Sequence, residues 1–279
     1  MCCVFIQMTK TEYIEIDGKR LETAWHGPPP DEALTLVFLH EGLGCVEMWK
    51  EFPAELAAAT GCGALVFSRL GYGRSDPCDL PRPIEFMHHE GLEILPKVLE
   101  AARIEKCILI GHSDGGSIGL IFAGGTPAKA LKGLITLAAH VFCEDLTIES
   151  IRAARERYLN SDLKQKLAKY HGRNVECAFR GWNDVWLHPD FENWNIEQFL
   201  PKIKVPLLAI QGEDDPYGTP AQIESLVNQT GGQATSLMIS NCSHRPHADH
   251  QDLVLNEIKK FVANIDYKSS KSFQNYISP

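Results

Sequence analysis

One serine of the chain has the surroundings of a nucleophile. Gly111-x-Ser113-x-Gly115 follows an apolar run, residues 107–110, and precedes a helical pattern over residues 117–124. A motif of this spacing sets a serine oxygen on a sharp turn from a strand into a helix, where small residues let the helix cross the strand closely. A nucleotide-binding loop would need Gly-x-Gly-x-x-Gly or a Lys-Ser/Thr ending, and this motif has neither. The spacing therefore predicts a nucleophilic serine.

A serine hydroxyl reacts poorly at neutral pH, so it needs a histidine base within hydrogen-bond reach and an acid that orients the base. On this kind of turn the acid and then the histidine come later in the chain. Residues 213–215, Glu-Asp-Asp, follow the apolar run 205–210, and His244 follows the run 236–240. The pattern predicts His244 as the base and does not choose among the three carboxylates.

For these side chains to meet, the strands that precede them must end on the same side of one sheet. Apolar runs without alternation are typical of strands buried on both faces of a parallel sheet. Such runs occur at residues 34–39, 64–68, 107–110, 133–138, 205–210 and 236–240. Helical patterns occur at residues 48–60, 84–103, 117–124 and 253–265. This order predicts a right-handed, mostly parallel α/β sheet. Ahead of it, residues 13–22 alternate around Asp17-Gly18, which predicts a β-hairpin.

The alternation of strands and helices stops between residues 144 and 202. This segment is charged, has a helical period and lacks a buried-strand pattern. It also holds three of the five tryptophans: Trp182, Trp186 and Trp194. We therefore expect a helical insertion there, within a core domain formed by residues 1–143 and 203–267. Residues 268–279 are polar, and we expect them to form a frayed tail.

Composition excludes several classes of protein. The 279 residues are 44% apolar and 23% charged, close to the average soluble protein and unlike a disordered or collagen-like chain. No run approaches the roughly 18 apolar residues of a membrane helix, and the N-terminus lacks the basic region of a secretory signal. Lys plus Arg is 27 against 36 Asp plus Glu, and the resulting net charge of −9 disfavours nucleic acid or an anionic membrane surface as a partner.

The nine cysteines are odd in number and irregular in spacing, and no Cys-x-x-Cys occurs, which argues against a zinc ribbon or a thioredoxin-like site. We expect reduced thiols in a cytoplasmic protein that is a monomer or a homodimer. The adjacent Cys2 and Cys3 could accept a palmitate, whereas the glycine that myristoylation needs is absent from position 2.

Several short stretches together carry a family resemblance. They are His40-Glu41-Gly42-Leu43-Gly44, Ser68-Arg69-Leu70-Gly71-Tyr72-Gly73-Arg74-Ser75, Gly111-His112-Ser113-Asp114-Gly115-Gly116, Gly212-Glu213-Asp214-Asp215 and Ser243-His244-Arg245-Pro246-His247. Over roughly residues 13–265 the chain resembles the α/β-hydrolase superfamily and, within it, the capped serine hydrolases. The resemblance implies the α/β-hydrolase fold, a mostly parallel central sheet flanked by helices, with residues 144–202 as a helical cap.

The resemblance also implies the triad. It makes Ser113 the nucleophile, His244 the base and Asp215 the acid, because the family acid lies three residues after the glycine that stands here at 212. Pro216 gives weak independent support, since it biases Asp215 toward extended backbone and stiffens the loop.

An oxyanion hole is implied as well. The backbone N–H groups of Asp114 and Gly42 would form it, with Leu43 as the alternative to Gly42. Glu41 departs from the family pattern, in which glycine is usual at this position. A carboxylate there could crowd or tune the oxyanion hole.

The implied activity is cleavage of a carboxylic ester of a small molecule through an acyl-enzyme intermediate, without a cofactor or a metal. Epoxide hydrolases and haloalkane dehalogenases are disfavoured, because they use Asp where Ser113 stands. Hydrolysis of a C–C bond in a vinylogous 1,5-diketone, of a thioester or of a lactone stays open, because these reactions use the same triad. A ligand receptor of low turnover on the same fold is the alternative from another class.

Candidates for contact with the substrate are Glu41, Leu43, Asp114, Trp182 and Trp186. Asp114 belongs to a Ser-Asp-Gly-Gly string that resembles the one in valacyclovir hydrolase-like esterases, and its carboxylate would favour cationic substrates. The alternative is a simple preference for acids in the first turn of a helix. The tryptophans could line a pocket or form the core of the cap.

Other polar residues near these motifs have structural interpretations. We expect His40 to be hydrogen-bonded within its turn. We expect the side chain of His112 to pack and to point away from the nucleophile. Arg69 and Arg74 would fix loops through ion pairs.

A metal site is not predicted. His247-x-Asp249-His250 matches half of a metal-binding pattern of metallo-β-lactamase-like hydrolases. Position 245 is Arg where that pattern has His, and the segment lies at the wrong end of the chain.

Overall fold

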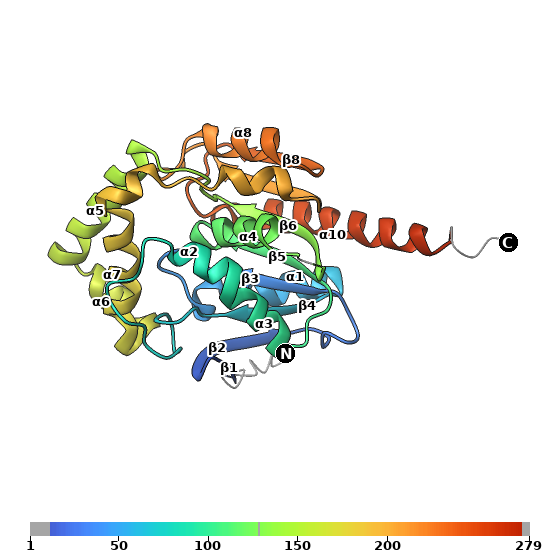
Figure 1. Cartoon of the computed structure of the whole chain (residues 1–279), viewed down its shortest axis with the longest axis horizontal. Coiled ribbons are helices and arrows are strands. Elements are labelled where there is room, and N and C mark those ends of the chain that lie inside the picture. Colours follow the sequence, from blue (N-terminus) through green and yellow to red (C-terminus); the bar gives the residue numbers. More distant parts are fainter. Residues whose placement is uncertain (1–11, 128, 275–279) are drawn as a thin grey trace, which may run out of the picture.

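The computed structural model describes residues 12–127 and 129–274, with side chains up to residue 265. One eight-stranded sheet has the order β1-β2-β4-β3-β5-β6-β7-β8 (Figure 1). Its strands are β1 Glu12–Ile16, β2 Lys19–His26, β3 Thr35–Leu39, β4 Gly63–Phe67, β5 Cys107–His112, β6 Leu131–Leu137, β7 Leu207–Gly212 and β8 Ala234–Ile239. The pairs β1–β2 and β2–β4 are antiparallel and all other neighbours are parallel, which confirms the expected fold class.

The N-terminal hairpin follows from its turn residues. Asp17 and Gly18 have φ angles of +51° and +73°. A two-residue turn with both φ angles positive matches the twist of an antiparallel pair, and aspartate followed by glycine accepts it at low cost. The hairpin predicted around these residues is confirmed.

The inner strands β3 to β7 are buried on both faces, as their unbroken apolar runs predicted. The edge strand β8, for which a buried strand was also predicted, is partly exposed. Alternate residues of each strand enter two separate hydrophobic clusters, so that Val37 and Leu39 lie on one face and Leu36 and Phe38 on the other. The first face is covered by α3 (Leu95–Ala101), α4 (Asp114–Gly125) and α8 (Pro220–Gln229). The second is covered by α1 (Phe52–Thr60) and α10 (Gln251–Gln274) (Figure 1). The sequence pattern had not indicated α8.

Two predicted helices are divided, and local residues explain both divisions. Residues 48–60 form a 3₁₀ turn, η1 (Val46–Trp49), and then α1, because Lys50 takes a φ of +55° between them. Residues 84–103 form α2 (Phe86–His89), a π turn η2 (Glu90–Ile94) and α3. Pro96, near the start of α3, has no N–H to donate to the preceding turn, and a widened turn accommodates that loss.

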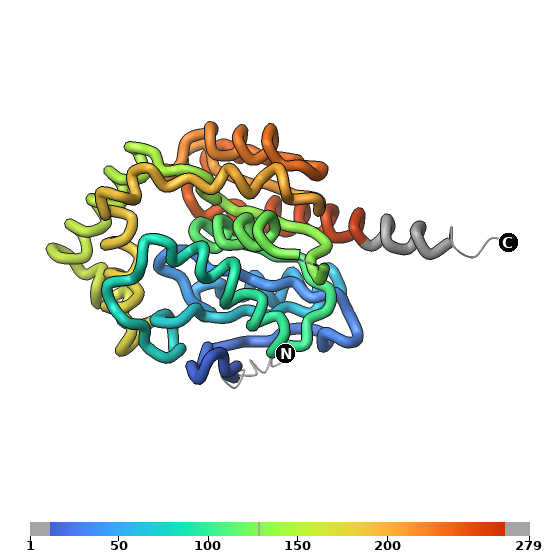
Figure 2. The backbone as a smooth tube through the Cα atoms, in the orientation of Figure 1, coloured from blue at the N-terminus to red at the C-terminus, as the bar shows by residue number. Residues whose placement is uncertain are grey.

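Residues 144–202 are helical, as predicted, and connect β6 to β7. They comprise α5 (Asp145–Asn160), α6 (Leu163–His171), η3 (Gly172–Asn174), α7 (Val175–Trp186), η4 (Pro189–Asn193) and η5 (Glu197–Lys202). The helices α5, α6 and α7 lie together beyond one end of the strands, at the left of Figure 2 in yellow-green and yellow. Residues of α5 and α7 line one cavity together with Ser113, which follows β5. The insertion therefore lies at the carboxyl end of the parallel strands.

The C-terminal helix is longer than predicted. After α9 (Pro246–Asp249), α10 continues to Gln274, so the prediction of a frayed tail is wrong for residues 268–274. Apart from Phe273 those residues are polar, but they include neither glycine nor proline, so no residue breaks the helix there. Residues 275–279, Cys2 and Cys3 lie outside the described residues. Within the described part of the chain, no helix is both long and apolar enough to cross a bilayer.

Candidate active site

Ser113 stands on a strained turn between β5 and α4. Its φ and ψ are +51° and −120°, a conformation that costs free energy for a residue with a side chain. Its N–H donates to the carbonyl oxygen of Leu137 over 2.9 Å, which ties the turn to β6. A Cβ atom added at Gly115 would collide with the carbonyl oxygen of Leu39, because α4 crosses β3 closely. The strand, turn and helix predicted around the serine are therefore present.

His244 is held by the carboxylate of Asp215. Its Nδ1 lies 2.8 Å from Oδ1 and 2.9 Å from Oδ2, and Oδ1 also accepts the N–H of Tyr217. Burial opposes ionisation of Asp215, but the hydrogen bonds and the charge of His244 hold its pKa below the usual value. Glu213 and Asp214, the other two carboxylates of this loop, are exposed.

Ser113 and His244 line one cavity of about 460 Å³ beneath the helical insertion. Among the described residues, no hydrogen bond joins the Ser113 hydroxyl to His244. Such bonds are often long before a substrate binds. Apolar side chains from the insertion and two loops make up much of the wall: Leu43, Met48, Ile151, Leu163, Leu167, Trp182 and Trp186.

The turn after β3 directs a backbone N–H toward this cavity. The carbonyl oxygen of Glu41 accepts hydrogen bonds from His40 Nδ1 (2.7 Å) and Arg69 Nη2 (3.2 Å). Because a trans peptide is planar, the N–H of Gly42 points the opposite way from this carbonyl. The indole of Trp182 packs directly on Gly42, where a Cβ atom would collide with it. The position of Gly42 is therefore fixed by the two donors that bind the Glu41 carbonyl and by Trp182 of α7, which packs on it.

The expectation for His40 is confirmed, since its Nε2 also accepts the backbone N–H of Arg69 at 3.0 Å. The expectation that Arg69 fixes its loop through an ion pair is wrong. Arg69 is buried and fixes the loop by donating to the carbonyl oxygens of His40 and Glu41, with no carboxylate partner among the described residues. Arg74 does form an ion pair, 3.8 Å from Glu22.

His112 does more than pack. Its ring lines the cavity and contacts both the loop of His244 and the turn of Glu41. Nε2 lies 2.7 Å from the carbonyl oxygen of His244, and Nδ1 lies 3.3 Å from Oε2 of Glu41. The expectation of simple packing is therefore incomplete, because the turn of Glu41 and the loop of His244 both come within reach at the end of β5. That the ring points away from Ser113 stays a prediction.

Asp114 is fully buried at the cavity. One carboxylate oxygen accepts the indole N–H of Trp186 at 3.2 Å, and the other has no hydrogen-bond partner among the described residues. Burial raises the pKa of Asp114, although the nearby guanidinium groups of Arg69 and Arg82 oppose this shift. Its charge is therefore partly compensated, and the cationic-substrate hypothesis stays a prediction.

The three tryptophans of the insertion differ in position. Trp182 and Trp186 line the cavity, as the substrate-contact hypothesis requires. Trp194 is absent from its wall. The Trp194 ring packs 5.6 Å from the ring of Trp186 and is stacked on Phe191 at 5.3 Å. Trp194 is part of the hydrophobic core.

Two further side chains at the site had no signal in the sequence. The ring of Tyr217 lies 4.7 Å from the ring of His244. The ring of His140 lies 5.8 Å from the ring of His244, and its Nε2 donates to the carbonyl oxygen of Tyr217. Burial lowers the pKa of His140 to about 4, so it is neutral at pH 7. Both follow strands, where loop residues can reach the site.

The histidines near the C-terminus do not converge. The ring of His247 packs against Trp49, Asp249 accepts the N–H of Ser243, and His250 contacts the carbonyl oxygen of Asn241. Among the described residues, no group of three or more His, Cys, Asp or Glu side chains is arranged to hold a metal ion.

The topology and this strained turn are characteristic of one family. A model of the alpha/beta hydrolase family matches residues 36–257, most of the chain. This protein belongs to the α/β hydrolase family. Two curated relatives are named serine hydrolase BPHL. The human one is 31% identical over 150 residues, 52% of this chain and 51% of the relative. The mouse one is 28% identical over 172 residues, 60% of this chain and 58% of the relative. The chain thus matches little more than half the length of these relatives.

Solved structures of other α/β hydrolases share the fold. The proline iminopeptidase of Mycobacterium smegmatis superposes with a TM-score of 0.71 at 18% identity and covers 93% of this chain and 100% of its own. The esterase RhEst1 of Rhodococcus sp. ECU1013 gives 0.70 at 16%, covering 92% and 100%. The enol-lactonase of Burkholderia xenovorans LB400 gives 0.69 at 19%, covering 90% and 100%. At these identities the likeness concerns the fold alone.

Proposed function

We propose that this α/β hydrolase cleaves carboxylic esters of small molecules through an acyl-enzyme intermediate. The observation that carries the proposal is the position of His244. Its Nδ1 is engaged by both oxygens of Asp215, and its ring shares a cavity with Ser113 on the strained turn. A histidine whose Nδ1–H is fixed in this way presents Nε2 as a base, which is the role that activates a serine.

In the proposed reaction, the Ser113 oxygen attacks the ester carbonyl while His244 Nε2 takes its proton. His244 then returns the proton to the leaving alcohol, and Asp215 stabilises the histidine cation formed in between. Water repeats the sequence and releases the carboxylic acid. The N–H groups of Asp114, which as the first residue of α4 has no acceptor within the helix, and of Gly42 would stabilise the oxyanion.

The wall of the cavity supports a substrate with an apolar part. Leu43 and the insertion residues Ile151, Leu167 and Trp182 would contact an acyl or alcohol group of moderate size. Residues 144–202 would then act as the cap that selects the substrate. Thioesters, lactones and vinylogous diketones would engage the same residues, so the bond that is cleaved must be decided by a substrate panel.

The direct test is Ser113→Ala. We expect the variant to fold and to lose ester hydrolysis by at least about 10⁴-fold, because the nucleophile is absent. Steady-state rates on p-nitrophenyl acetate, butyrate and octanoate measure this loss, and thermal unfolding followed by circular dichroism controls for folding.

A fluorophosphonate should label wild-type protein at Ser113 and leave Ser113→Ala unlabelled. Unchanged turnover of the variant, or labelling at another residue, would refute the mechanism. No labelling together with no turnover would favour a ligand receptor. Matched thioester, lactone and diketone substrates, and an aminoacyl ester, then rank the bonds and charges that the site accepts.

A further inference from the structure

Two side chains at the cavity have no part in the proposed acyl transfer, yet they connect loops that do. Glu41 belongs to the turn after β3, and His112 immediately precedes Ser113. Nε2 of His112 lies 2.7 Å from the carbonyl oxygen of His244, and Nδ1 lies 3.3 Å from Oε2 of Glu41. The turn of Glu41, the turn of Ser113 and the loop of His244 therefore meet at one imidazole ring.

The two contacts determine how many protons this pair holds. A backbone carbonyl oxygen only accepts, so Nε2 of His112 carries a hydrogen and donates to His244. Nδ1 then faces a carboxylate oxygen, which also only accepts when it is ionised. The contact is attractive only with one more proton between Nδ1 and Oε2. Glu41 and His112 together thus hold one proton more than a carboxylate beside a neutral histidine, and their total charge is zero.

The surroundings assign that proton to His112. Burial opposes ionisation of Glu41, but the hydrogen bond and the charge of His112 outweigh it and hold the pKa of Glu41 below its usual range. Glu41 is therefore a carboxylate, so the extra proton that the two contacts require lies on His112, whose side chain is 1% exposed. A buried ion pair contributes little net stability after its desolvation cost, but it restricts its two partners to one geometry.

We propose that the Glu41–His112 pair positions the oxyanion turn against the base, and that it does so only while the shared proton is bound. The inference rests on the ester hydrolysis proposed above. On one side, the backbone of Glu41 sets the direction of the Gly42 N–H. On the other side, His112 holds the backbone of His244. When the proton leaves, the Nδ1 lone pair and the carboxylate repel each other, and the two loops lose their connection.

The pKa values of other titratable groups around the pair are shifted away from their usual values. His247 packs 4.8 Å from the ring of His112, and burial lowers its pKa to about 3. Burial and the charge of Arg69 hold the pKa of His40, beside Glu41, well below its usual value. Burial raises the pKa of the Cys45 thiol to about 12.

Further charged or chargeable groups of the described residues lie on this side of the site, and Arg69, which donates to the carbonyl oxygen of Glu41, is one of them. His244, whose ring lies 5.2 Å from that of His112, is the proposed base, and Arg245 is an exposed cation next to it in sequence. While the pair is neutral overall, it does not repel the His244 cation that forms during catalysis. The contact between Glu41 and His112 is present while the shared proton is bound and is lost when that proton leaves. Activity should therefore fall at high pH.

The test compares Glu41→Gln with Glu41→Ala over the pH range 5 to 10. A glutamine amide donates to a neutral Nδ1 and needs no shared proton, so Glu41→Gln should lose less kcat than Glu41→Ala and should lack the fall in activity at high pH. Glu41→Ala removes the contact and should lower kcat by up to about 100-fold, with little change in KM for a short ester, because misplaced groups mainly affect the chemical step.

His112→Phe, which keeps a ring without nitrogens, should resemble Glu41→Ala. Circular dichroism checks folding, and fluorophosphonate labelling of Ser113 reports separately on the proposed function. An alkaline fall that persists in Glu41→Gln, or a wild-type profile in Glu41→Ala, overturns the positioning role while the labelling stands. An equal loss of kcat in Glu41→Gln and Glu41→Ala overturns it as well, because a side chain that restores the contact with Nδ1 would then not restore activity.

Discussion

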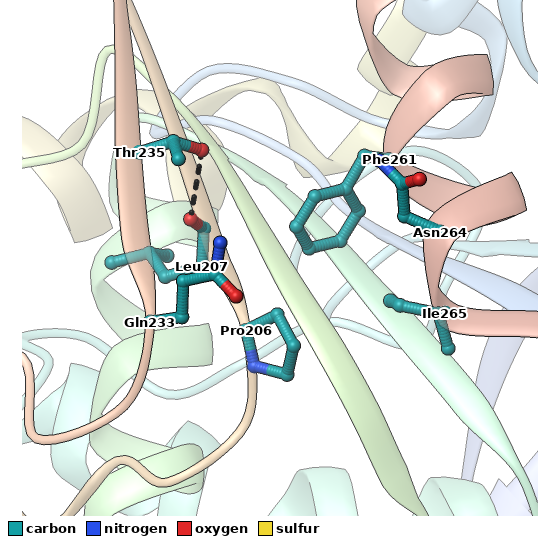
Figure 3. Close-up of a pocket in the computed structure, with 7 residues that line it drawn as sticks. All are labelled: Pro206, Leu207, Gln233, Thr235, Phe261, Asn264 and Ile265. Carbon is teal, nitrogen blue, oxygen red and sulfur yellow. Dashed lines mark hydrogen bonds between the residues drawn. The ribbon is translucent and has the colours of Figure 1, made fainter. Parts of the chain in front are cut away.

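The two ends of the parallel sheet carry cavities of opposite character. At the end where β7 and β8 begin, a hollow of about 260 Å³ is lined by Pro206, Leu207, Gln233, Thr235, Phe261, Asn264 and Ile265 (Figure 3). None of these residues titrates. Thr235 Oγ1 donates a weak hydrogen bond to the Leu207 carbonyl, and the Leu207 N–H donates to the Gln233 carbonyl at 2.9 Å. At the other end, the wall of the candidate site includes acids, arginines, histidines and two serines.

The topology explains this difference. The turns that follow β3, β5, β7 and β8 all leave the sheet at the same edge and contribute Glu41, Ser113, Asp215 and His244. In open α/β sheets, ligands bind outside the carboxyl ends of the strands for this reason. The hollow at the opposite end brings together side chains from two strand starts and one helix. A cavity lined by no titratable group offers no acid, base or charged nucleophile, so we expect functional effects to be confined to one end.

The sharpest test of this contrast lies within one loop at the carboxyl end. Asp215→Asn should lower kcat by up to about 10⁴-fold, because an amide facing Nδ1 of His244 favours the wrong tautomer. Asp214→Asn is the matched control. Its side chain is exposed, and its backbone N–H, which the substitution keeps, donates to the carbonyl oxygen of Cys242. We expect it to stay within about twofold of wild type, in line with other exposed substitutions.

Both aspartate variants should be assayed on the same good ester at one pH, after circular dichroism. A crippled Asp214→Asn beside an active Asp215→Asn would move the acid by one residue. Two unimpaired variants would place the acid elsewhere.

The tryptophans of residues 144–202 test whether substrate selectivity depends only on residues that line the cavity. Trp182→Ala opens the cavity beside Gly42 and should change the octanoate-to-acetate rate ratio by about tenfold, the scale of a few contacts in an apolar pocket. Trp194→Ala should leave that ratio unchanged, although losing a buried indole costs about 3–5 kcal/mol of stability. Initial rates on both esters and urea unfolding measure the two effects. Equal ratios in the two variants would contradict a selective role for residues 144–202.

The smallest effect on activity is expected at the other end of the sheet. Phe261→Ala enlarges the hollow of Figure 3 and removes packing against Gly133, where the ring lies close. It should lower the free energy of unfolding by about 1–3 kcal/mol, since this ring is partly exposed and a fully buried one costs more. Its kcat and KM should match wild type when measured well below the unfolding temperature. A changed kcat would show that the two ends are coupled.

Much of the fold was readable from local patterns. The unbroken apolar runs predicted the buried parallel strands, and Asp17-Gly18 predicted the hairpin, because these signals depend on neighbours in sequence. The same is true of the turn at Ser113, where glycines mark a close approach of helix and strand. The division of the helix predicted at residues 48–60 was not predicted, because the spacing of apolar residues does not reveal a residue with positive φ such as Lys50.

The sequence by itself determined the identity of the reactive side chains and the order in which strands deliver them. Only the tertiary structure decided which side chains meet. It brought Asp215, rather than its two acidic neighbours, to His244, and it excluded Trp194 from the cavity. It also placed His112 between Glu41 and the backbone of His244, residues 71 and 132 positions away. Contacts over such separations depend on how the sheet aligns its strand ends, which no local pattern encodes.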